Sequence, residues 1–244
     1  MCESCGCGDT ELVPLELQEK ILGENDRLAG HNREHFLEAG VLAVNLMGSP
    51  GSGKTAILEA TSRHAPGRRF AAVAGDLATD HDAARLVRAG IPSQALTTGS
   101  ACHLDAKMIH RALHDIPLAG LDVFFIENVG NLVCPAVYDL GQAVNVVALA
   151  ITEGEDKPLK YPTMFRKADL VLLTKMDLQP HVGADLAAIE DALARVMPAP
   201  KMIAVSARTG QGIEEWLAWL GLTQKIAWPT LSAAHTTLGH IPER

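Results

Sequence analysis

Several features that would point to particular classes of protein are scarce in this sequence. Aromatic residues make up 4% of the 244 residues. Basic residues are outnumbered, with 21 Lys and Arg against 29 Asp and Glu, so the net charge is −8. Non-specific nucleic-acid binding needs a basic face, so we expect no nucleic-acid partner. The longest apolar runs, such as 144–151, fall well short of the roughly 18 residues that suggest a membrane span, so we expect no membrane partner.

A secretory leader and a disulfide framework are also not indicated. The N-terminus lacks the basic stretch and apolar core of a signal peptide, which predicts a cytoplasmic location. The five cysteines are an odd count that suits thiolate metal ligands better than disulfides. Three of them, Cys2, Cys5 and Cys7, are close enough to bind one ion, either square-planar Ni²⁺ with a nitrogen ligand or tetrahedral Zn²⁺.

Apolar patterning divides the chain into four segments. Residues 1–10 have no apolar periodicity and are expected to form a flexible Cys-rich tail. Residues 11–40 carry apolar side chains at helical spacing, as one helix or two, since two glycines interrupt the pattern. Residues 41–222 are predicted to form one domain, and the polar residues 223–244 a C-terminal extension.

Within the predicted domain, buried apolar runs alternate with amphipathic stretches. The expected strands are 41–47, 70–74, 121–126, 144–151, 170–173 and 202–205. The expected helices are 56–64, 83–89, 106–114, 184–196 and 213–220. This alternation is typical of an α/β fold, with a mainly parallel sheet and helices on both faces. Ligands of such sheets bind at the carboxyl ends of the strands.

A phosphate-binding loop follows the first of these strands. Residues 48–55 fit the pattern G-x-x-x-x-G-K-[ST] between a strand and a helix, which is the context that the motif requires. Its backbone N–H groups would surround phosphate oxygens, Lys54 would contact the β- and γ-phosphates, and the Thr55 hydroxyl would bind Mg²⁺. The predicted nucleotide contacts of this loop are Gly48, Ser49, Pro50, Gly51, Ser52, Gly53, Lys54 and Thr55.

Two acidic residues end predicted strands at the same edge of the sheet. Asp76 and Glu127 are therefore expected as further Mg²⁺ ligands, with Glu127 in the Walker-B position. The alternative is that each only caps the element that follows. Either Asp76 or Asp82 would position the water that attacks the γ-phosphate of the nucleotide. With Lys54, they make up the predicted catalytic residues.

The end of the strand at 170–173 indicates which base is bound. Residues 174–177 read T-K-M-D, which is similar to the N-K-x-D element of GTPases with Thr in place of Asn. The carboxylate of Asp177 can accept hydrogen bonds from guanine N1–H and the 2-amino group, whereas adenine would leave it unpaired. Lys175 would lie over the base or brace the phosphate loop, and GTP is favoured over ATP. Further base contacts are expected from an element similar to S-A-K, at Ser206, Ala207 and Arg208.

A second candidate metal site lies near the predicted γ-phosphate position. Cys102 and His103 precede a predicted helix, and Cys134 lies just beyond Glu127. Isolated cysteines are commonly small buried hydrophobic residues, so the spacing alone leaves metal binding and a structural role both open. No ligand spacing is recognised among the other histidines, His31, His35, His64, His81, His110, His114, His181, His235 and His240.

Together these residues resemble the hydrogenase nickel-incorporation GTPases of the HypB family. The resemblance spans residues 1 to about 222, and its longest strings are E-N-V-G-N-L-V-C-P at 127–135 and E-G-E-D-K-P-L-K-Y-P at 153–162. It implies Ni²⁺ at the N-terminal cysteines and a second Ni²⁺ or Zn²⁺ at Cys102, His103 and Cys134. It also implies a homodimer when GTP is bound, with the metal site at the interface. Nickel would pass to a hydrogenase large-subunit precursor with the help of a HypA-type chaperone.

Two departures from the family pattern and two rival functions accompany this resemblance. A His-rich segment after the cysteines is absent, which argues against bulk nickel storage, and the tail beyond 222 has no counterpart. A related urease-type accessory GTPase would show C-P-H where this chain reads C-H-L-D at 102–105. A metal-binding buffer with a purely structural nucleotide would show no turnover.

Overall fold

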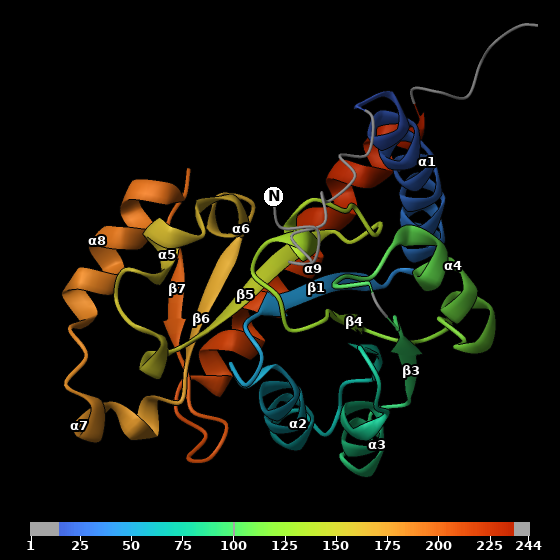
Figure 1. Cartoon of the computed structure of the whole chain (residues 1–244). Helices are drawn as coiled ribbons and strands as arrows, with labels where there is room; N and C mark the ends of the chain where they lie inside the picture. Colours follow the sequence, from blue (N-terminus) through green and yellow to red (C-terminus); the bar gives the residue numbers. More distant parts are fainter. Residues whose placement is uncertain (1–14, 100, 237–244) are drawn as a thin grey trace, which may run out of the picture.

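A single parallel sheet organises the part of the chain that the structure describes. The computed structural model describes residues 15–99 and 101–236, and Figure 1 shows their arrangement. Seven strands within these residues pair in the order β3-β2-β4-β1-β5-β6-β7, and every pairing is parallel. They are β1 (Leu42–Gly48), β2 (Phe70–Asp76), β3 (Ser93–Thr97), β4 (Val123–Glu127), β5 (Val144–Ala150), β6 (Leu170–Thr174) and β7 (Met202–Ala204).

Helices cover both faces of this sheet, which confirms the predicted fold class. The α-helices are α1 (Leu15–Ala39), α2 (Lys54–His64), α3 (His81–Arg88), α4 (Ala106–Asp115), α5 (Lys157–Lys160), α6 (Pro162–Arg166), α7 (Gln179–Val182), α8 (Leu186–Val196) and α9 (Ile213–Thr236). Apolar side chains of α2, α3 and α9 pack on one face, and those of α1, α4, α6 and α8 pack on the other. In Figure 1, α1 and α4 lie at one end of the sheet and α5, α6 and α8 at the other.

The central strand β1 shows how the sequence fills both faces. Alternate side chains of a strand point to opposite faces, so a strand covered on both sides is apolar throughout. Leu42, Val44 and Leu46 pack with α2 and α9, while Ala43 and Met47 join the clusters on the opposite face. β1 is the central strand of the sheet, with β4 on one side and β5 on the other. The phosphate loop, which begins at its carboxyl end, therefore lies at the middle of the edge formed by the carboxyl ends of the strands.

The structure differs from the expected elements in several places, and the short helices α5, α6 and α7 were not predicted. The strand β3 was not predicted, because Ser93–Thr97 reads S-Q-A-L-T and is only partly buried at the edge of the sheet. Of the two alternatives for the N-terminal helical segment, the structure has the single helix, α1, despite its two glycines. The expected boundary between residues 222 and 223 falls inside α9, which continues without a break to Thr236.

The remaining tail predictions lie elsewhere in the chain. Cys2, Cys5 and Cys7 are outside the described residues, as are His240 and the end of the C-terminal extension. No helix in the described ranges has both the length and the apolar character needed to cross a membrane.

Candidate nucleotide and metal site

The phosphate loop links the end of β1 to the start of α2 and is built around glycines. Gly51 and Gly53 have φ values of +74° and +96°, a region that residues with a Cβ rarely adopt. A Cβ at Gly48 would meet the carbonyl oxygen of Ala148 on the neighbouring strand β5. The loop therefore needs these glycines both for its turn and for its close approach to the sheet.

Lys54 is held inside this loop. Its Nζ lies 3.4 Å from the carbonyl oxygen of Gly48 and 3.3 Å from that of Ser49, and the side chain is buried. Burial lowers the pKa of the Lys54 ammonium, while the carboxylates of Glu127 and Asp82 act in the opposite direction. A buried cation with only weak backbone contacts is suited to bind an anionic group that enters the pocket.

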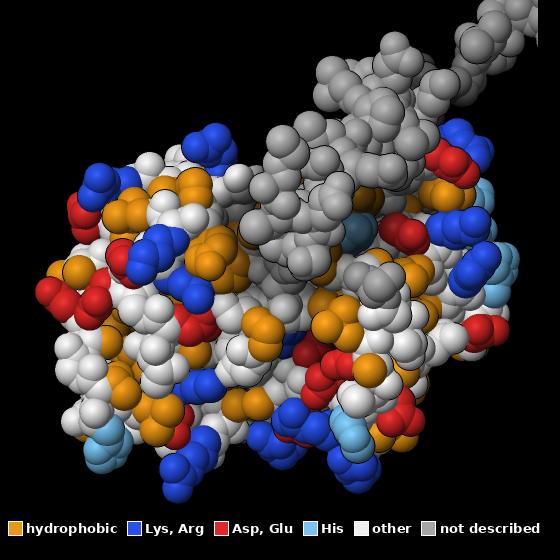
Figure 2. Space-filling view, in the orientation of Figure 1, with side chains coloured by type: hydrophobic (Ala, Val, Ile, Leu, Met, Phe, Trp, Pro, Cys, Tyr) orange, Lys and Arg blue, Asp and Glu red, His pale blue; other side chains and the backbone are white. Residues whose placement is uncertain are grey.

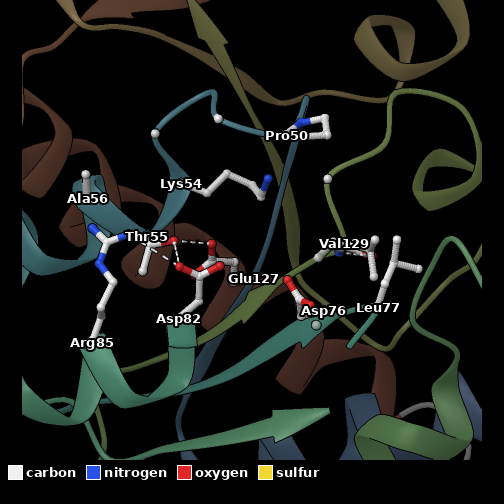
Figure 3. A pocket seen from close by; sticks show the side chains of 15 residues that line it. Pro50, Lys54, Thr55, Ala56, Asp76, Leu77, Asp82, Arg85, Glu127 and Val129 are labelled. Carbon is white, nitrogen blue, oxygen red and sulfur yellow. Dashed lines mark hydrogen bonds and ion pairs between the residues drawn. The ribbon is translucent and has the colours of Figure 1, made fainter. Parts of the chain in front are cut away.

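Three oxygen-bearing side chains meet beside Lys54, as Figure 3 shows. The Oγ1 of Thr55 lies 2.7 Å from Oε1 of Glu127 and 2.9 Å from Oδ1 of Asp82. Burial raises the pKa of Glu127 to about 7, and the hydrogen bond from Thr55 opposes this shift. The buried Oε2 of Glu127 has no hydrogen-bond partner among the described residues. This set of hard oxygen ligands, with one buried oxygen unpaired, fits Mg²⁺.

Asp76 lines the same cavity but is held differently. Its Oδ1 accepts hydrogen bonds of 2.9 Å from the backbone N–H groups of Ala78 and Thr79, which lower the pKa of the carboxyl group. The cavity measures about 420 Å³ and is also lined by Lys54, Glu127 and the residues that follow Glu127. Both Asp76 and Asp82 thus lie at the pocket, and only Asp82 bonds to Thr55 among the described contacts.

The two predicted base-binding elements meet each other. Ser206 follows β7 and is fully buried, and its Oγ donates to Oδ1 of Asp177 at 2.6 Å. Arg208 lies near the same carboxylate, with Nη1 3.8 Å from Oδ2 of Asp177, but its side chain is largely exposed. Lys175 has a left-handed backbone with φ of 60°. Thr174 donates from Oγ1 to the carbonyl oxygen of Ser52, so this element is joined to the phosphate loop.

Two thiols and an imidazole form a compact cluster next to the nucleotide pocket. The Sγ atoms of Cys102 and Cys134 are 2.7 Å apart, and one ligand atom from each of Cys102, His103 and Cys134 lies within 4.8 Å of the others. The hydrogen bond with Cys102, burial and the charge of Cys102 raise the pKa of Cys134 to about 11. Burial lowers the pKa of His103, whose ring stacks on Tyr138 at 3.8 Å. Thiols and a neutral imidazole suit a borderline divalent ion.

The loop after β4 joins this cluster to the phosphate loop. A Cβ at Gly130 would lie 2.9 Å from Cα of Pro50, and Asn131 forms an antiparallel bridge with Gly48. The Oδ1 of Asn131 accepts from the backbone N–H of Cys134 at 3.4 Å. Direct contacts therefore run from the phosphate loop to the backbone of Cys134, whose thiol belongs to the cluster.

A second connection approaches from Cys102. The Oδ1 of Asn128, directly after Glu127, accepts from the N–H of Leu104 at 3.2 Å. The side chain of Leu104 packs against Gly75, where an added Cβ would lie 2.9 Å from Leu104 Cγ. The segment that carries Cys102 thus rests on the strand ends that line the nucleotide pocket.

The comparisons with known proteins address this whole arrangement. A family model for the nucleotide-binding domain of CobW/HypB/UreG proteins matches residues 42–204. The hydrogenase maturation factor HypB of Azotobacter chroococcum mcd 1 is 51% identical over 212 residues, which cover 84% of this chain and 68% of that protein. The chain belongs to the HypB family. This confirms the family to which the sequence motifs pointed.

Solved structures of HypB share the fold. The crystal structure of HypB from Helicobacter pylori in complex with nickel is 38% identical, with a TM-score of 0.80, and the match covers 84% of this chain and 97% of that one. HypB from Archaeoglobus fulgidus is 42% identical, with a TM-score of 0.76 over 83% of this chain and all of that one. This HypB-family chain therefore has the P-loop fold that the strand and helix pattern predicted.

Sequence analysis missed two contributors to the site of this HypB-family chain. Glu153 accepts from Ser49 of the phosphate loop through Oε2 and from the N–H of Ala150 through Oε1. It lies three residues after the end of β5, so its place near a strand end was the available signal. Tyr138, which stacks on His103, lies in an irregular segment and gave no such signal.

Proposed function

We propose that this chain is a GTP-hydrolysing nickel metallochaperone that delivers Ni²⁺ for the maturation of [NiFe]-hydrogenase. As a member of a family of hydrogenase maturation factors, it has relatives whose names state the maturation role, and one relative was solved in complex with nickel. Its proposed partners are a HypA-type chaperone and the hydrogenase large-subunit precursor. Its proposed organisation is a metal-binding tail at 1–10, a helical segment at 11–40, a GTPase domain at 41–222 and an extension at 223–244.

One observation carries the proposal: the backbone bridge between Gly48 and Asn131 connects the nucleotide pocket with the cysteine cluster. Loops that contact the γ-phosphate and Mg²⁺ change conformation when hydrolysis removes those contacts. Because Cys134 lies on such a loop, the bound nucleotide would change the geometry of the thiol ligands. Linkage then requires the bound metal to change nucleotide affinity by the same factor.

The chain's own residues have distinct roles in the proposed hydrolysis. Lys54 would exchange its weak contacts with the loop carbonyls for the β- and γ-phosphate oxygens. Thr55 and Glu127, with Asp76, would hold Mg²⁺, which neutralises phosphate charge when bound. Asp82 or Asp76 would orient the attacking water. Asp177 would select guanine, with Lys175 and the Ser206 element completing the base site.

The proposed metal cycle uses two sets of ligands. Cys2, Cys5 and Cys7 would bind Ni²⁺, and the cluster of Cys102, His103 and Cys134 would bind Ni²⁺ or Zn²⁺. We further propose that GTP binding brings two copies of the chain together, with this cluster at their interface. Transfer would then follow the change of nucleotide state.

The decisive experiment measures Ni²⁺ affinity of the reduced full chain without nucleotide, with GDP and with a non-hydrolysable GTP analogue. Light scattering records the oligomeric state in each case. Three proteins are compared: the unmodified chain, a variant with Ala at the first three cysteine positions, and a Cys102→Ala/Cys134→Ala variant. A His181→Gln variant, altered at an exposed residue of α7, serves as the matched control.

We expect a Ni²⁺ site that survives loss of the N-terminal cysteines, is lost in Cys102→Ala/Cys134→Ala and has an affinity that changes with the bound nucleotide. Dimerisation should change with the nucleotide as well. If all Ni²⁺ binding is lost with the N-terminal cysteines, or if Ni²⁺ affinity is the same with every nucleotide, the proposed control of metal binding by the nucleotide is contradicted. Nickel binding at full stoichiometry without GTP turnover would instead favour the metal-binding buffer. A urease-type accessory role would show as activation of a urease precursor in place of a hydrogenase precursor.

A further inference from the structure

Histidines from two packed helices gather on the surface away from the nucleotide pocket. His31 and His35 are four residues apart on α1, and His110 lies on the neighbouring helix α4. One ligand nitrogen from each of the three lies within 4.8 Å of the others. Figure 2 shows histidine side chains at the edge of the molecule where Figure 1 places α1 and α4. The rings of His31 and His35 have their centroids 4.5 Å apart.

A buried asparagine fixes the tautomer of His110. The amide nitrogen of Asn32, which is fully buried, donates to the carbonyl oxygens of Ala106 at 2.8 Å and Leu140 at 3.2 Å. Its Oδ1 is therefore an acceptor, and it faces Nδ1 of His110 at 3.2 Å. Nδ1 must carry the proton of the neutral ring, which leaves the lone pair on Nε2. Metal-binding histidines are held in this way, with the other ring N–H donated to a carbonyl or carboxylate.

His31 has a similar outer contact, with a carboxylate in place of an amide. Its Nδ1 lies 3.5 Å from Oε2 of Glu34, one turn along α1. The side chains of His31 and Glu34 are about half exposed, at 52% and 54%, so they can rotate. Three nitrogens bound to one tetrahedral ion at about 2.0–2.1 Å lie about 3.3–3.4 Å from one another, so each separation must shorten by at most about 1.5 Å, which rotation of these side chains can supply.

We propose that His31, His35 and His110 form a binding site for a divalent transition-metal ion of the Zn²⁺ and Ni²⁺ type. Imidazole ligands suit these ions, and three histidines leave further coordination positions for water or for a ligand from a partner. Because the ligands come from α1 and α4, the bound ion ties the N-terminal helix to the domain. The site is separate from the cysteine cluster and requires no nucleotide.

The test isolates the histidine site from the sulfur ligands. The parent protein is the full chain with all five cysteines changed to Ala, and isothermal titration measures Zn²⁺ and Ni²⁺ binding at pH 7.5. We expect one ion per chain, and a His31→Gln/His35→Gln pair should weaken binding by at least about 100-fold, the upper part of the range for loss of outer-shell support alone. His181→Gln, on α7, should leave the affinity unchanged.

A second measurement covers the case in which the cysteine-free chain does not fold. In the unmodified cysteine background, His31→Gln/His35→Gln should lower the number of bound ions by one, and X-ray absorption should show fewer nitrogen ligands. The ion should also raise Tm in the parent but not in the double variant, since a ligand that binds only the folded state stabilises it. Equal stoichiometry and equal affinity in parent and double variant would overturn the site. Because these measurements use no nucleotide, that result would leave the proposed GTP-dependent function standing.

Discussion

At the scale of single residues, Asp177 carries the expected choice of base. Asp177→Asn keeps one oxygen that can accept from guanine N1–H, but its NH₂ group would face the 2-amino group of guanine and would donate to the 2-oxo group of xanthine. Loss of one charge-assisted hydrogen bond is worth about 1.5–3 kcal/mol, or roughly 10- to 10²-fold in Kd for GTP. Titration with GTP and XTP measures the exchange. Equal GTP affinity in the variant and the unmodified chain would contradict the assignment of Asp177 to the base site.

The raised pKa of Glu127, another single-residue property, predicts that the stability of the folded chain depends on pH. Its pKa of about 7 in the folded chain lies above the ordinary value of 4.5, so the folded state binds more protons between these values. The free energy of unfolding of the nucleotide-free chain should therefore fall by up to about 3 kcal/mol as pH rises from about 4.5 to about 7.

Glu127→Gln should remove this component, because an amide does not titrate. Urea denaturation at several pH values, compared between the unmodified chain and the variant, isolates the contribution of this one group from that of the other carboxylates. Glu190→Gln, at an exposed position of α8, is the matched control and should keep the slope of the unmodified chain. Parallel pH profiles for the unmodified chain and Glu127→Gln would rule out the raised pKa.

At the scale of elements, one buried hydrogen bond joins α9 to α2. The indole Nε1 of Trp216 donates to Oγ1 of Thr61 at 2.9 Å, and both side chains are fully buried. Thr61→Val keeps the shape but leaves the indole N–H unpaired, which should lower the free energy of unfolding by about 1–3 kcal/mol. Thr223→Val removes a hydroxyl whose hydrogen bond among the described residues lies within α9, to the carbonyl oxygen of Trp219, and should change stability by less than about 0.5 kcal/mol. Chemical denaturation compares the two, and equal effects would contradict the role of this contact.

How far the elements could be predicted depends on how strongly burial marked them. The strands β1, β4 and β5 are covered on both faces and read as continuous apolar runs, so the sequence located them to within a few residues. The edge strand β3 pairs on one side only and tolerates polar side chains, which removed the signal. The continuation of α9 past residue 222 was missed for a similar reason, because its later residues follow no clear periodicity.

The site was predictable where a motif fixes neighbours in sequence and not where the fold creates them. The phosphate loop and Asp177 follow strand ends in recognisable strings, so their positions could be expected. The meeting of Cys102 with Cys134, across 32 residues, was left open by spacing and appears only in the structure. The histidines of α1 and α4 were dismissed because the packing of those two helices, which brings them together, is not visible in a linear pattern.

At the scale of the whole molecule, Lys54 is expected to favour nucleotide binding while lowering the stability of the nucleotide-free chain. Its burial lowers the pKa of the ammonium, so the folded chain carries a desolvation cost at this position. Lys54→Met should leave the nucleotide-free chain at least as stable as the unmodified one. It should also abolish the stabilisation by saturating GTP, which amounts to about 2.7 kcal/mol at a concentration 100 times Kd. Thermal melts with and without Mg²⁺ and GTP measure both effects, and an undiminished GTP shift in the variant would contradict the placement of Lys54 at the phosphates.

The bridge between Gly48 and Asn131 also bears on how such a protein can change over evolution. The contact is made by main-chain atoms, so it persists whichever side chains occupy the neighbouring positions. Other residues at positions 102, 103 and 134 would therefore leave this connection to the phosphate loop intact. Under the proposed function, the side chains that select the metal are thus separate from the main-chain contact that responds to the nucleotide, and exchanging them should alter metal preference while that contact is kept.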